Sequence, residues 1–139
     1  MAKFYLCKVC GNIVEKVEDS GLAPFCCAKK MTLLDPQESE GSHEKHIPVV
    51  TATQLCCEAE NQKALTLVHV EVGSEPHPTQ NNHYIQWIEL ETDKGVQRHF
   101  LKIGDPPSTN FMICSSEKIL NVYAYCNVHG LWACTKCTK

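Results

Sequence analysis

Four cysteines near the start of the chain constrain how its first part can fold. They form a Cys-x2-Cys pair, Cys7 and Cys10, and an adjacent pair, Cys26 and Cys27. A segment of about thirty-five residues cannot bury enough apolar surface to fold unaided, so we expect a metal ion to hold it together. Four thiolates in a tetrahedral array bind either iron or zinc, and both metals remain open from the spacing alone. The adjacent pair is unusual for a zinc ribbon, because neighbouring side chains tend to point apart.

The bulk composition limits the classes of protein to consider. A length of 139 residues fits one ordinary domain plus a small one. The net charge of −3 predicts no nucleic-acid or membrane surface. No apolar run approaches the roughly 18–20 residues that cross a bilayer, and no secretory signal is visible before Cys7. Ten cysteines without such a signal indicate metal ligation rather than a disulfide framework.

The larger, C-terminal part of the chain has the pattern of an all-β domain. Residues 84–91 alternate between apolar and polar side chains, and turn signals such as Asp93-Lys94-Gly95 separate the candidate strands. Short strands at this spacing predict a β-sandwich. We expect strands at residues 64–72, 84–91, 96–103, 110–114 and 119–125. The polar stretch before this part, residues 35–42, is typical of a linker.

Five further metal-ligand side chains are scattered over three motifs in this second part. Four neutral imidazoles and one thiolate are too many ligands for the tetrahedral site that zinc prefers. They suit a five-coordinate iron with one position left open. The five residues are His46, His77, His83, Cys126 and His129.

The two ligand sets together resemble desulfoferrodoxin, the two-iron form of the superoxide reductases. In the first part, the match is carried by residues 10–15 (Cys-Gly-Asn-Ile-Val-Glu) and by Met31-x-Leu33-Leu34 after the adjacent cysteines. In the second part, it is carried by the three histidine motifs. One departure is Ala-Lys-Lys at residues 28–30, where relatives commonly have Gly-Glu-Pro. It removes no ligand, but it changes the charge and hydrogen bonding around the sulfurs.

The resemblance implies an all-β protein built from two metal-binding parts. The first is a small desulforedoxin-like FeS4 domain at residues 1–36. After a linker at residues 37–42, the second is a seven-stranded, immunoglobulin-like β-sandwich at residues 43–139. The implied cofactors are two non-haem iron ions. Cys7, Cys10, Cys26 and Cys27 would bind the first iron; His46, His77, His83 and His129 would be equatorial ligands of the second, with Cys126 as its axial thiolate.

The same resemblance implies a superoxide reductase, which protects an anaerobe from oxidative stress. One electron would reduce superoxide to hydrogen peroxide without forming dioxygen, so an external carrier must return the electron. Lys45 is expected to attract superoxide, since an ammonium near the open position raises the encounter rate with a small anion. Glu44 matches a glutamate that can occupy the sixth position after oxidation. The implied setting is a cytoplasmic homodimer with a rubredoxin-like electron donor.

The other cysteines and histidines are expected to lie outside both metal sites. Cys114 is most simply a small buried apolar residue. We expect Cys134 and Cys137 to be free thiols, although a redox-active dithiol stays open, as does a zinc-knuckle spacing with the Cys126 motif. The residues without an assigned role, or excluded as ligands, are Cys56, Cys57, His43, His69 and His99.

Three competing functions follow from the same residues. A pure electron-transfer protein would use both irons as carriers, but the open position opposite Cys126 argues against it. A zinc-stapled binding module would be colourless, and it leaves His46, His77 and His83 unexplained. Superoxide dismutation is the third candidate, as a weak side reaction. A ferric state that persists until an external reductant arrives distinguishes a reductase from a dismutase.

Overall fold

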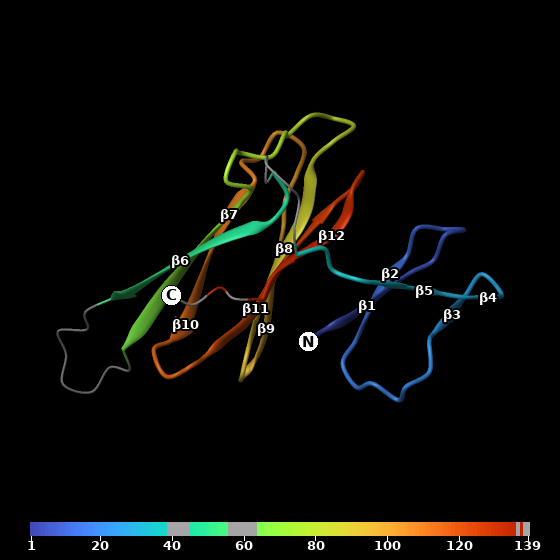
Figure 1. Cartoon of the computed structure of the whole chain (residues 1–139), viewed down its shortest axis with the longest axis horizontal. Coiled ribbons are helices and arrows are strands. Elements are labelled where there is room, and N and C mark those ends of the chain that lie inside the picture. The colour runs from blue at the N-terminus through green and yellow to red at the C-terminus, as the bar shows by residue number, and fades with distance from the viewer. Residues whose placement is uncertain (39–44, 56–63, 136, 138–139) are drawn as a thin grey trace. The chain divides into compact units, whose positions relative to one another are not determined.

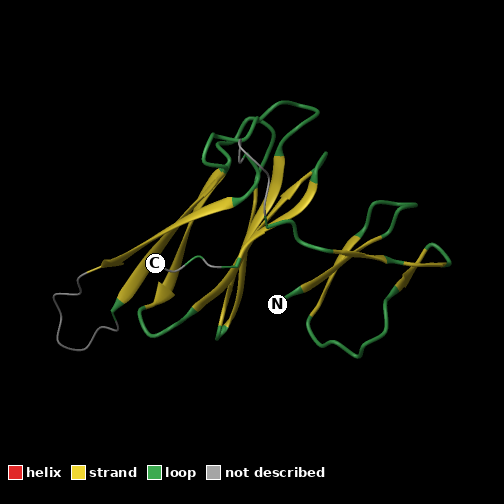
Figure 2. Ribbon diagram, in the orientation of Figure 1, coloured by secondary structure: helices red, strands yellow, loops and turns green. Residues whose placement is uncertain are grey.

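The structure is a computed structural model that describes residues 1–38, 45–55, 64–135 and 137. These residues form twelve β-strands and no helix (Figures 1 and 2), which confirms the expected all-β class. The described residues include no helix that could cross a membrane. The chain divides into two compact units, Met1–Asp35 and Pro36–Lys139.

The first unit consists of a small sheet and a short hairpin. Strand β1 (Lys3–Leu6) lies at the centre of the sheet, between β2 (Ile13–Lys16) and β5 (Thr32–Leu34), and both neighbours are antiparallel to it. The hairpin pairs β3 (Phe25–Cys26) with β4 (Lys29–Lys30). The adjacent cysteines therefore lie in this hairpin: Cys26 ends β3, and Cys27 is in the turn before β4.

The core of the first unit is small and includes two of the predicted metal ligands. Tyr5, Cys7 and Met31 are buried, and the partly buried Ala23 and Cys26 pack against them. So few apolar side chains bury little area, at roughly 25 cal/mol for each Å² removed from water. A metal held by these cysteines would thus supply part of the stability that the core lacks.

The second unit is a sandwich of two antiparallel sheets, and its seven strands match the expected number. One sheet has three strands in the order β10-β7-β6, and the other has four in the order β12-β11-β8-β9. The strands of the two sheets are β6 (Pro48–Leu55), β7 (Leu65–Val72), β10 (Ser108–Cys114), β8 (Ile85–Thr92), β9 (Gly95–Phe100), β11 (Ile119–Cys126) and β12 (Gly130–Cys134).

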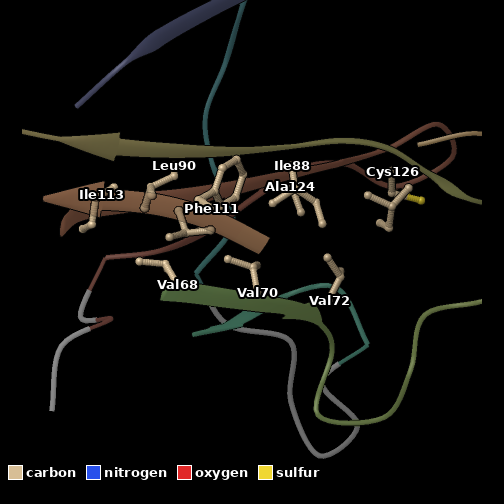
Figure 3. Close-up of a cluster of buried hydrophobic side chains, with 11 residues drawn as sticks. Val68, Val70, Val72, Ile88, Leu90, Phe111, Ile113, Ala124 and Cys126 are labelled. Carbon is tan, nitrogen blue, oxygen red and sulfur yellow. The ribbon is translucent and has the colours of Figure 1, made fainter. Parts of the chain in front are cut away.

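The inward faces of both sheets form one hydrophobic core (Figure 3). Along β7, Val68, Val70 and Val72 are fully buried while the residues between them are exposed, as expected for a strand with one solvated face. Along β11, burial is continuous from Asn121 to Cys126. The core therefore extends to the thiol of Cys126 at the end of that strand.

Two strands of the sandwich are absent from the pattern-based prediction. Strand β6 is an edge strand whose side chains are mostly exposed, so its sequence has no clear apolar alternation. It begins at Pro48, a position that an edge strand tolerates. Strand β12 has only five residues. The predicted linker, residues 37–42, lies mostly outside the described residues, but Gln37 exchanges backbone hydrogen bonds with Leu131 and Ala133 around β12.

Candidate metal centres

The strand registers bring the five scattered ligands to one end of the sandwich. Pro48 at the start of β6 pairs with Val72 at the end of β7, and Cys126 at the end of β11 pairs with Ile85 at the start of β8. The segments beyond these strand ends carry the four histidines of the predicted site. Together with Cys126, each offers one ligand atom, and these five atoms all lie within 4.8 Å of one another.

The four imidazoles are arranged as a square. Neighbouring ring centroids are 4.6–4.8 Å apart along all four sides, whereas His46 and His83 face each other across a diagonal of 6.1 Å. Neighbouring rings are steeply inclined, with interplanar angles of 67–82°. Such a set of rings around one point matches four equatorial nitrogen ligands.

The nitrogens that face the centre can be identified from their distances. His129 Nδ1 lies 2.9 Å from His46 Nε2 and 3.1 Å from His83 Nε2. His77 Nδ1 lies 2.7 Å from the carbonyl oxygen of Pro78, and His77 Nε2 is buried without a hydrogen-bond partner among the described residues. A bound cation would accept the lone pair of this nitrogen, and it would also offset the repulsion between the other ring nitrogens that lie so close to one another. The donor set therefore fits a metal ion.

Cys126 approaches the square from the protein interior. Its side chain is fully buried, whereas His83 is half-buried and His129 is exposed. The Cys126 sulfur accepts a hydrogen bond from the backbone N–H of His129 at 3.4 Å and lies 3.8 Å from His129 Nδ1. The thiol thus reaches the four imidazoles from the buried side, and it would be the fifth ligand of a metal ion held there.

Desolvation lowers the pKa of two of the four histidines, His77 and His83. Desolvation lowers the pKa of His77 to about 4, and the neighbouring histidines lower it further, against a raising effect from the Pro78 carbonyl. The pKa of His83 is also lowered, first by desolvation and then by His129 and His46. Neutral imidazole at neutral pH presents a free lone pair to a cation.

The segment that carries His46 is held in place by a glycine. Gly73 has a φ of +87°, and a Cβ added there would lie 2.6 Å from the carbonyl oxygen of Lys45. The Gly73 N–H also donates to the Ile47 carbonyl at 3.0 Å. Only glycine allows this close approach, so it fixes the position of the residues on both sides of His46.

Lys45 precedes His46 and lies at the surface. Its ammonium is 3.8 Å from the carboxylate of Glu75, and the two side chains are 47% and 57% exposed. Glu44, which was predicted to act with Lys45, lies outside the described residues. Lys45 is therefore next to the site in sequence and carries a positive charge that Glu75 partly offsets.

Asn127 is a positioning residue that the pattern analysis did not assign. Its side-chain oxygen accepts from the Tyr84 N–H at 2.9 Å, and its amide donates to the Asn82 carbonyl at 3.1 Å. These bonds join the turn between Cys126 and His129 to the segment around His83. The sequence shows an asparagine between the two ligands, but its hydrogen-bond partners, at Tyr84 and Asn82, are more than 40 residues away. Local spacing therefore could not reveal its role.

The four N-terminal cysteines form the second group of ligands. Their sulfurs all lie within 4.8 Å of one another, with Cys10 and Cys26 at 3.6 Å. Gly11, at a φ of +79°, closes the turn between the first two cysteines, and its N–H donates to the Cys7 carbonyl at 2.9 Å. Cys27 has a φ of +51°. This left-handed conformation breaks the alternation that would point neighbouring side chains apart.

Hydrogen bonds within this group shift the pKa values of Cys7 and Cys27 in opposite directions. Backbone hydrogen bonds from Cys10 and Val9 lower the pKa of Cys7 to about 6. Hydrogen bonding to Cys10, and then to Cys26 and Cys7, raises the pKa of Cys27 to about 12. A bound metal would remove this conflict, because it stabilises each thiolate by direct coordination.

The remaining predicted side chains lie apart from both groups, with one correction. His69 pairs with Asn110, and His99 contacts Thr109 and the ring of Phe111. Cys114 is partly buried, and Cys56, Cys57 and His43 lie outside the described residues. The expectation of free thiols at Cys134 and Cys137 is wrong, because they form a disulfide. The zinc-knuckle alternative is wrong too, because Cys126 and His129 belong to the histidine cluster.

The fold and the two ligand groups define a class: a two-part, all-β metalloprotein with one site of four cysteines and one site of four histidines and a cysteine. Comparison with known proteins gives the family. The profile of the desulfoferrodoxin N-terminal domain matches residues 1–34, and the desulfoferrodoxin profile matches residues 38–135. The chain belongs to the desulfoferrodoxin family, and its cofactors are the family's two iron ions.

Individual relatives match almost the whole chain. A desulfoferrodoxin homolog of Archaeoglobus fulgidus is 41% identical over 92% of both chains. The desulfoferrodoxin of Nitratidesulfovibrio vulgaris is 38% identical over 94% of this chain and 93% of its own. Among solved structures, the superoxide reductase from Treponema pallidum aligns with a TM-score of 0.70 and 30% identity, over 96% of this chain and 97% of its own.

Proposed function

We propose that this chain is a superoxide reductase, which reduces superoxide to hydrogen peroxide with one electron and two protons. The observation that carries the proposal is the square of four histidines above the buried Cys126 thiol, in a chain of this family. Iron bound there would supply the electron and an open coordination position. His46, His77, His83, His129 and Cys126 are proposed as its ligands.

The charge of the ligand set favours an anionic substrate. Imidazole ligands are neutral, and the low pKa of His77 favours that form. A coordinated Cys126 thiolate would contribute the one negative charge among the five ligands. A ferrous site with this set carries about one net positive charge, which attracts a small anion. The exposed side of His129 gives a small molecule access from solvent.

Lys45 is the proposed steering residue. Its ammonium is exposed and lies next to His46 in the chain, so it extends the positive potential outside the ligand square. Glu44 is proposed as the group that occupies the open position after the electron has left. It would help the product depart, although it lies outside the described residues.

The remaining parts of the proposal concern the setting of the reaction. We propose that Cys7, Cys10, Cys26 and Cys27 hold an accessory FeS4 electron centre in a domain of residues 1–36. Residues 37–42 would link it to the catalytic domain at residues 43–139. A rubredoxin-like carrier would return the electron, and the protein would act as a cytoplasmic homodimer. The family match and the cluster of four cysteines in the first unit support the accessory centre, and the other points rest on the family alone.

The test is the stoichiometry of the reaction with superoxide. Ferrous protein mixed with a pulse of superoxide should yield one peroxide for each superoxide consumed, with no dioxygen, and the second iron should stay ferric until a reductant is added. The Cys126→Ser variant should lose the thiolate-to-iron absorption band and most of the rate. Dioxygen release without added reductant would instead indicate a dismutase, and a zinc-containing, colourless protein would indicate a binding module.

A further inference from the structure

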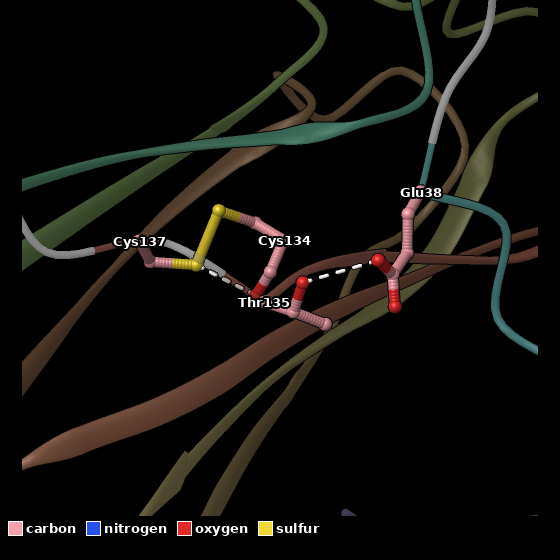
Figure 4. Close-up of a disulfide and its surroundings, with 4 residues drawn as sticks. All are labelled: Glu38, Cys134, Thr135 and Cys137. Carbon is pink, nitrogen blue, oxygen red and sulfur yellow. Dashed lines mark hydrogen bonds between the residues drawn. A yellow bond between two sulfur atoms is a disulfide. The ribbon is translucent and has the colours of Figure 1, made fainter.

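The strongest unassigned feature is the thiol pair at the end of the second unit. Cys134 is the last residue of β12, and Cys137 follows three positions later. The two form a disulfide with a Cα–Cα distance of 5.7 Å (Figure 4). Cys7, Cys10, Cys26, Cys27 and Cys114 form no disulfide with another described residue. Among the described cysteines, Cys134 and Cys137 are thus the pair that is joined through sulfur.

The disulfide lies on the strand that supports the histidine cluster. Trp132, two residues before Cys134, stacks on His46 with ring centroids 4.7 Å apart. Cys134, Ala133 and Thr135 line a surface hollow of about 230 Å³ together with Ile47, the residue after His46. Glu38 also lines the hollow and accepts a hydrogen bond from the Thr135 hydroxyl at 3.2 Å (Figure 4). A small molecule can therefore reach Cys134 close to the proposed reaction site.

A purely structural role explains this disulfide poorly. A disulfide stabilises a fold mainly by closing a loop, and the gain is smallest for short loops such as this one. Cys137 also lies beyond residue 135, where the family match ends, so the pair is not part of the shared fold. Its Cys-x2-Cys spacing is the one that stabilises a reactive thiolate in dithiol redox sites.

We propose that Cys134 and Cys137 form a second redox site, which reduces hydrogen peroxide and is recycled by a dithiol. The Cys134 thiol, in the lining of the hollow, loses its proton and its thiolate attacks one peroxide oxygen; the O–O bond breaks and the sulfur becomes a sulfenic acid. The departing hydroxide takes up the proton from the thiol and leaves as water. The Cys137 thiol then attacks that sulfur, the S–S bond forms and a second water leaves. Two thiols and one peroxide thus give one disulfide and two waters.

The reductant completes the cycle. A dithiol, on a partner protein or a small molecule, attacks the disulfide and leaves as a disulfide itself, so two electrons and two protons return to Cys134 and Cys137. The inference rests on the proposed function only for the source of the peroxide. The product of the iron site would be consumed on the same chain, a few residues from where it forms.

The test uses the full-length protein and added hydrogen peroxide. Protein reduced with dithiothreitol and freed of it receives one equivalent of peroxide, and remaining thiols are then alkylated. Lys136 stands between the two cysteines, so trypsin yields residues 119–136 and 137–139 joined by the disulfide, which mass spectrometry detects. Fragmentation distinguishes a bond to Cys134 from one to Cys126. We expect the linked peptides to increase with the peroxide added, and fresh dithiothreitol to reverse the link.

Three variants assign the two roles. Cys137→Ser should stop at a sulfenic acid on Cys134, which dimedone traps, whereas Cys134→Ser should lower the rate of peroxide consumption at least tenfold. Cys114→Ser is the matched control and should react like the unmodified protein. Failure to form the linked peptides, or a disulfide that resists dithiothreitol in the folded protein, would overturn the proposal. Because the peroxide is added, either result is independent of whether the same preparation reduces superoxide.

Discussion

The indole of Trp132 stacks on the imidazole of His46, with ring centroids 4.7 Å apart and ring planes inclined by only 17°. Both side chains are 6% exposed. Strand β12 carries no ligand of the histidine cluster itself. Through Trp132, however, it fixes the ring plane of the ligand His46. The Nε1–H of the indole is buried without a hydrogen-bond partner in the described part of the chain. The indole therefore acts on the site through the face of its ring rather than through its N–H.

Replacing Trp132 with Phe should therefore preserve the site, while Ala should damage it. Phe keeps an aromatic face on His46 and removes the unsatisfied N–H, so we expect the free energy of unfolding to change by less than about 1.5 kcal/mol. Ala leaves a cavity and should cost about 3–5 kcal/mol. Denaturant unfolding and the iron content of the second site check both. Equal losses in the two variants would contradict a stacking role.

The ion pair of Lys45 with Glu75 predicts a variant that is faster than the natural protein. Glu75→Gln removes the carboxylate that offsets the Lys45 ammonium, so the rate of superoxide encounter at low salt should rise about two- to fivefold, as expected for a surface pair worth up to about 1 kcal/mol. Lys45→Ala should lower the rate and its salt dependence. Rapid mixing at several ionic strengths measures both.

A control separates local steering from net charge. Glu117→Gln changes the net charge by the same amount but lies in the turn after Cys114, which pairs with Leu65 at the end of β7 away from the histidine cluster. Its rate should therefore stay near that of the unmodified protein. If Glu117→Gln and Glu75→Gln accelerate the reaction equally, the effect belongs to the overall charge and Lys45 has no steering role.

Ala28 predicts a stabilising substitution in the first unit. It has a φ of +58° directly after Cys27, where an L side chain costs about 1–2 kcal/mol. Ala28→Gly should raise the stability of this unit by roughly 0.5–1 kcal/mol after the greater unfolded-state entropy of glycine is subtracted. Ala28→Val should lower it, since β-branched residues avoid this conformation. The temperature at which the FeS4 absorption is lost measures the stability of this unit. A lower temperature for Ala28→Gly than for Ala28→Val would contradict backbone strain at residue 28.

The buried His77 predicts how pH acts on the metal-free protein. Its pKa falls from 6.5 to about 4 on folding, so the unfolded chain takes up a proton before the folded one does. Stability should be highest above about pH 6.5 and should decrease steadily as the pH falls toward 4. His83 shifts in the same direction and adds to the decrease.

Urea unfolding of the metal-free protein at several pH values tests this linkage. The His77→Gln variant should show a weaker dependence on pH between about 6.5 and 4, because one of the shifted groups is gone. A dependence identical to that of the unmodified protein would mean that His77 is not responsible.

The ligand types and the all-β class followed from the sequence, because both depend on local patterns. Cys7 and Cys10 sit in one tight turn, and the alternation in residues 84–91 marks a strand whatever it packs against. Strand β6 was missed, since most of its side chains face solvent and carry no apolar period. Strand β12 was missed because it has only five residues. The turn conformation of Cys27 was equally invisible, because its φ depends on the hairpin that surrounds it.

The sequence by itself determined which atoms could bind metal and how many there are. Only the tertiary structure decided their arrangement: His46 and His129 are 83 residues apart, yet their nitrogens lie 2.9 Å from each other because two sheets end at the same edge of the sandwich. The same packing placed Trp132 on His46. These contacts are set by the register between distant strands, which no local spacing encodes.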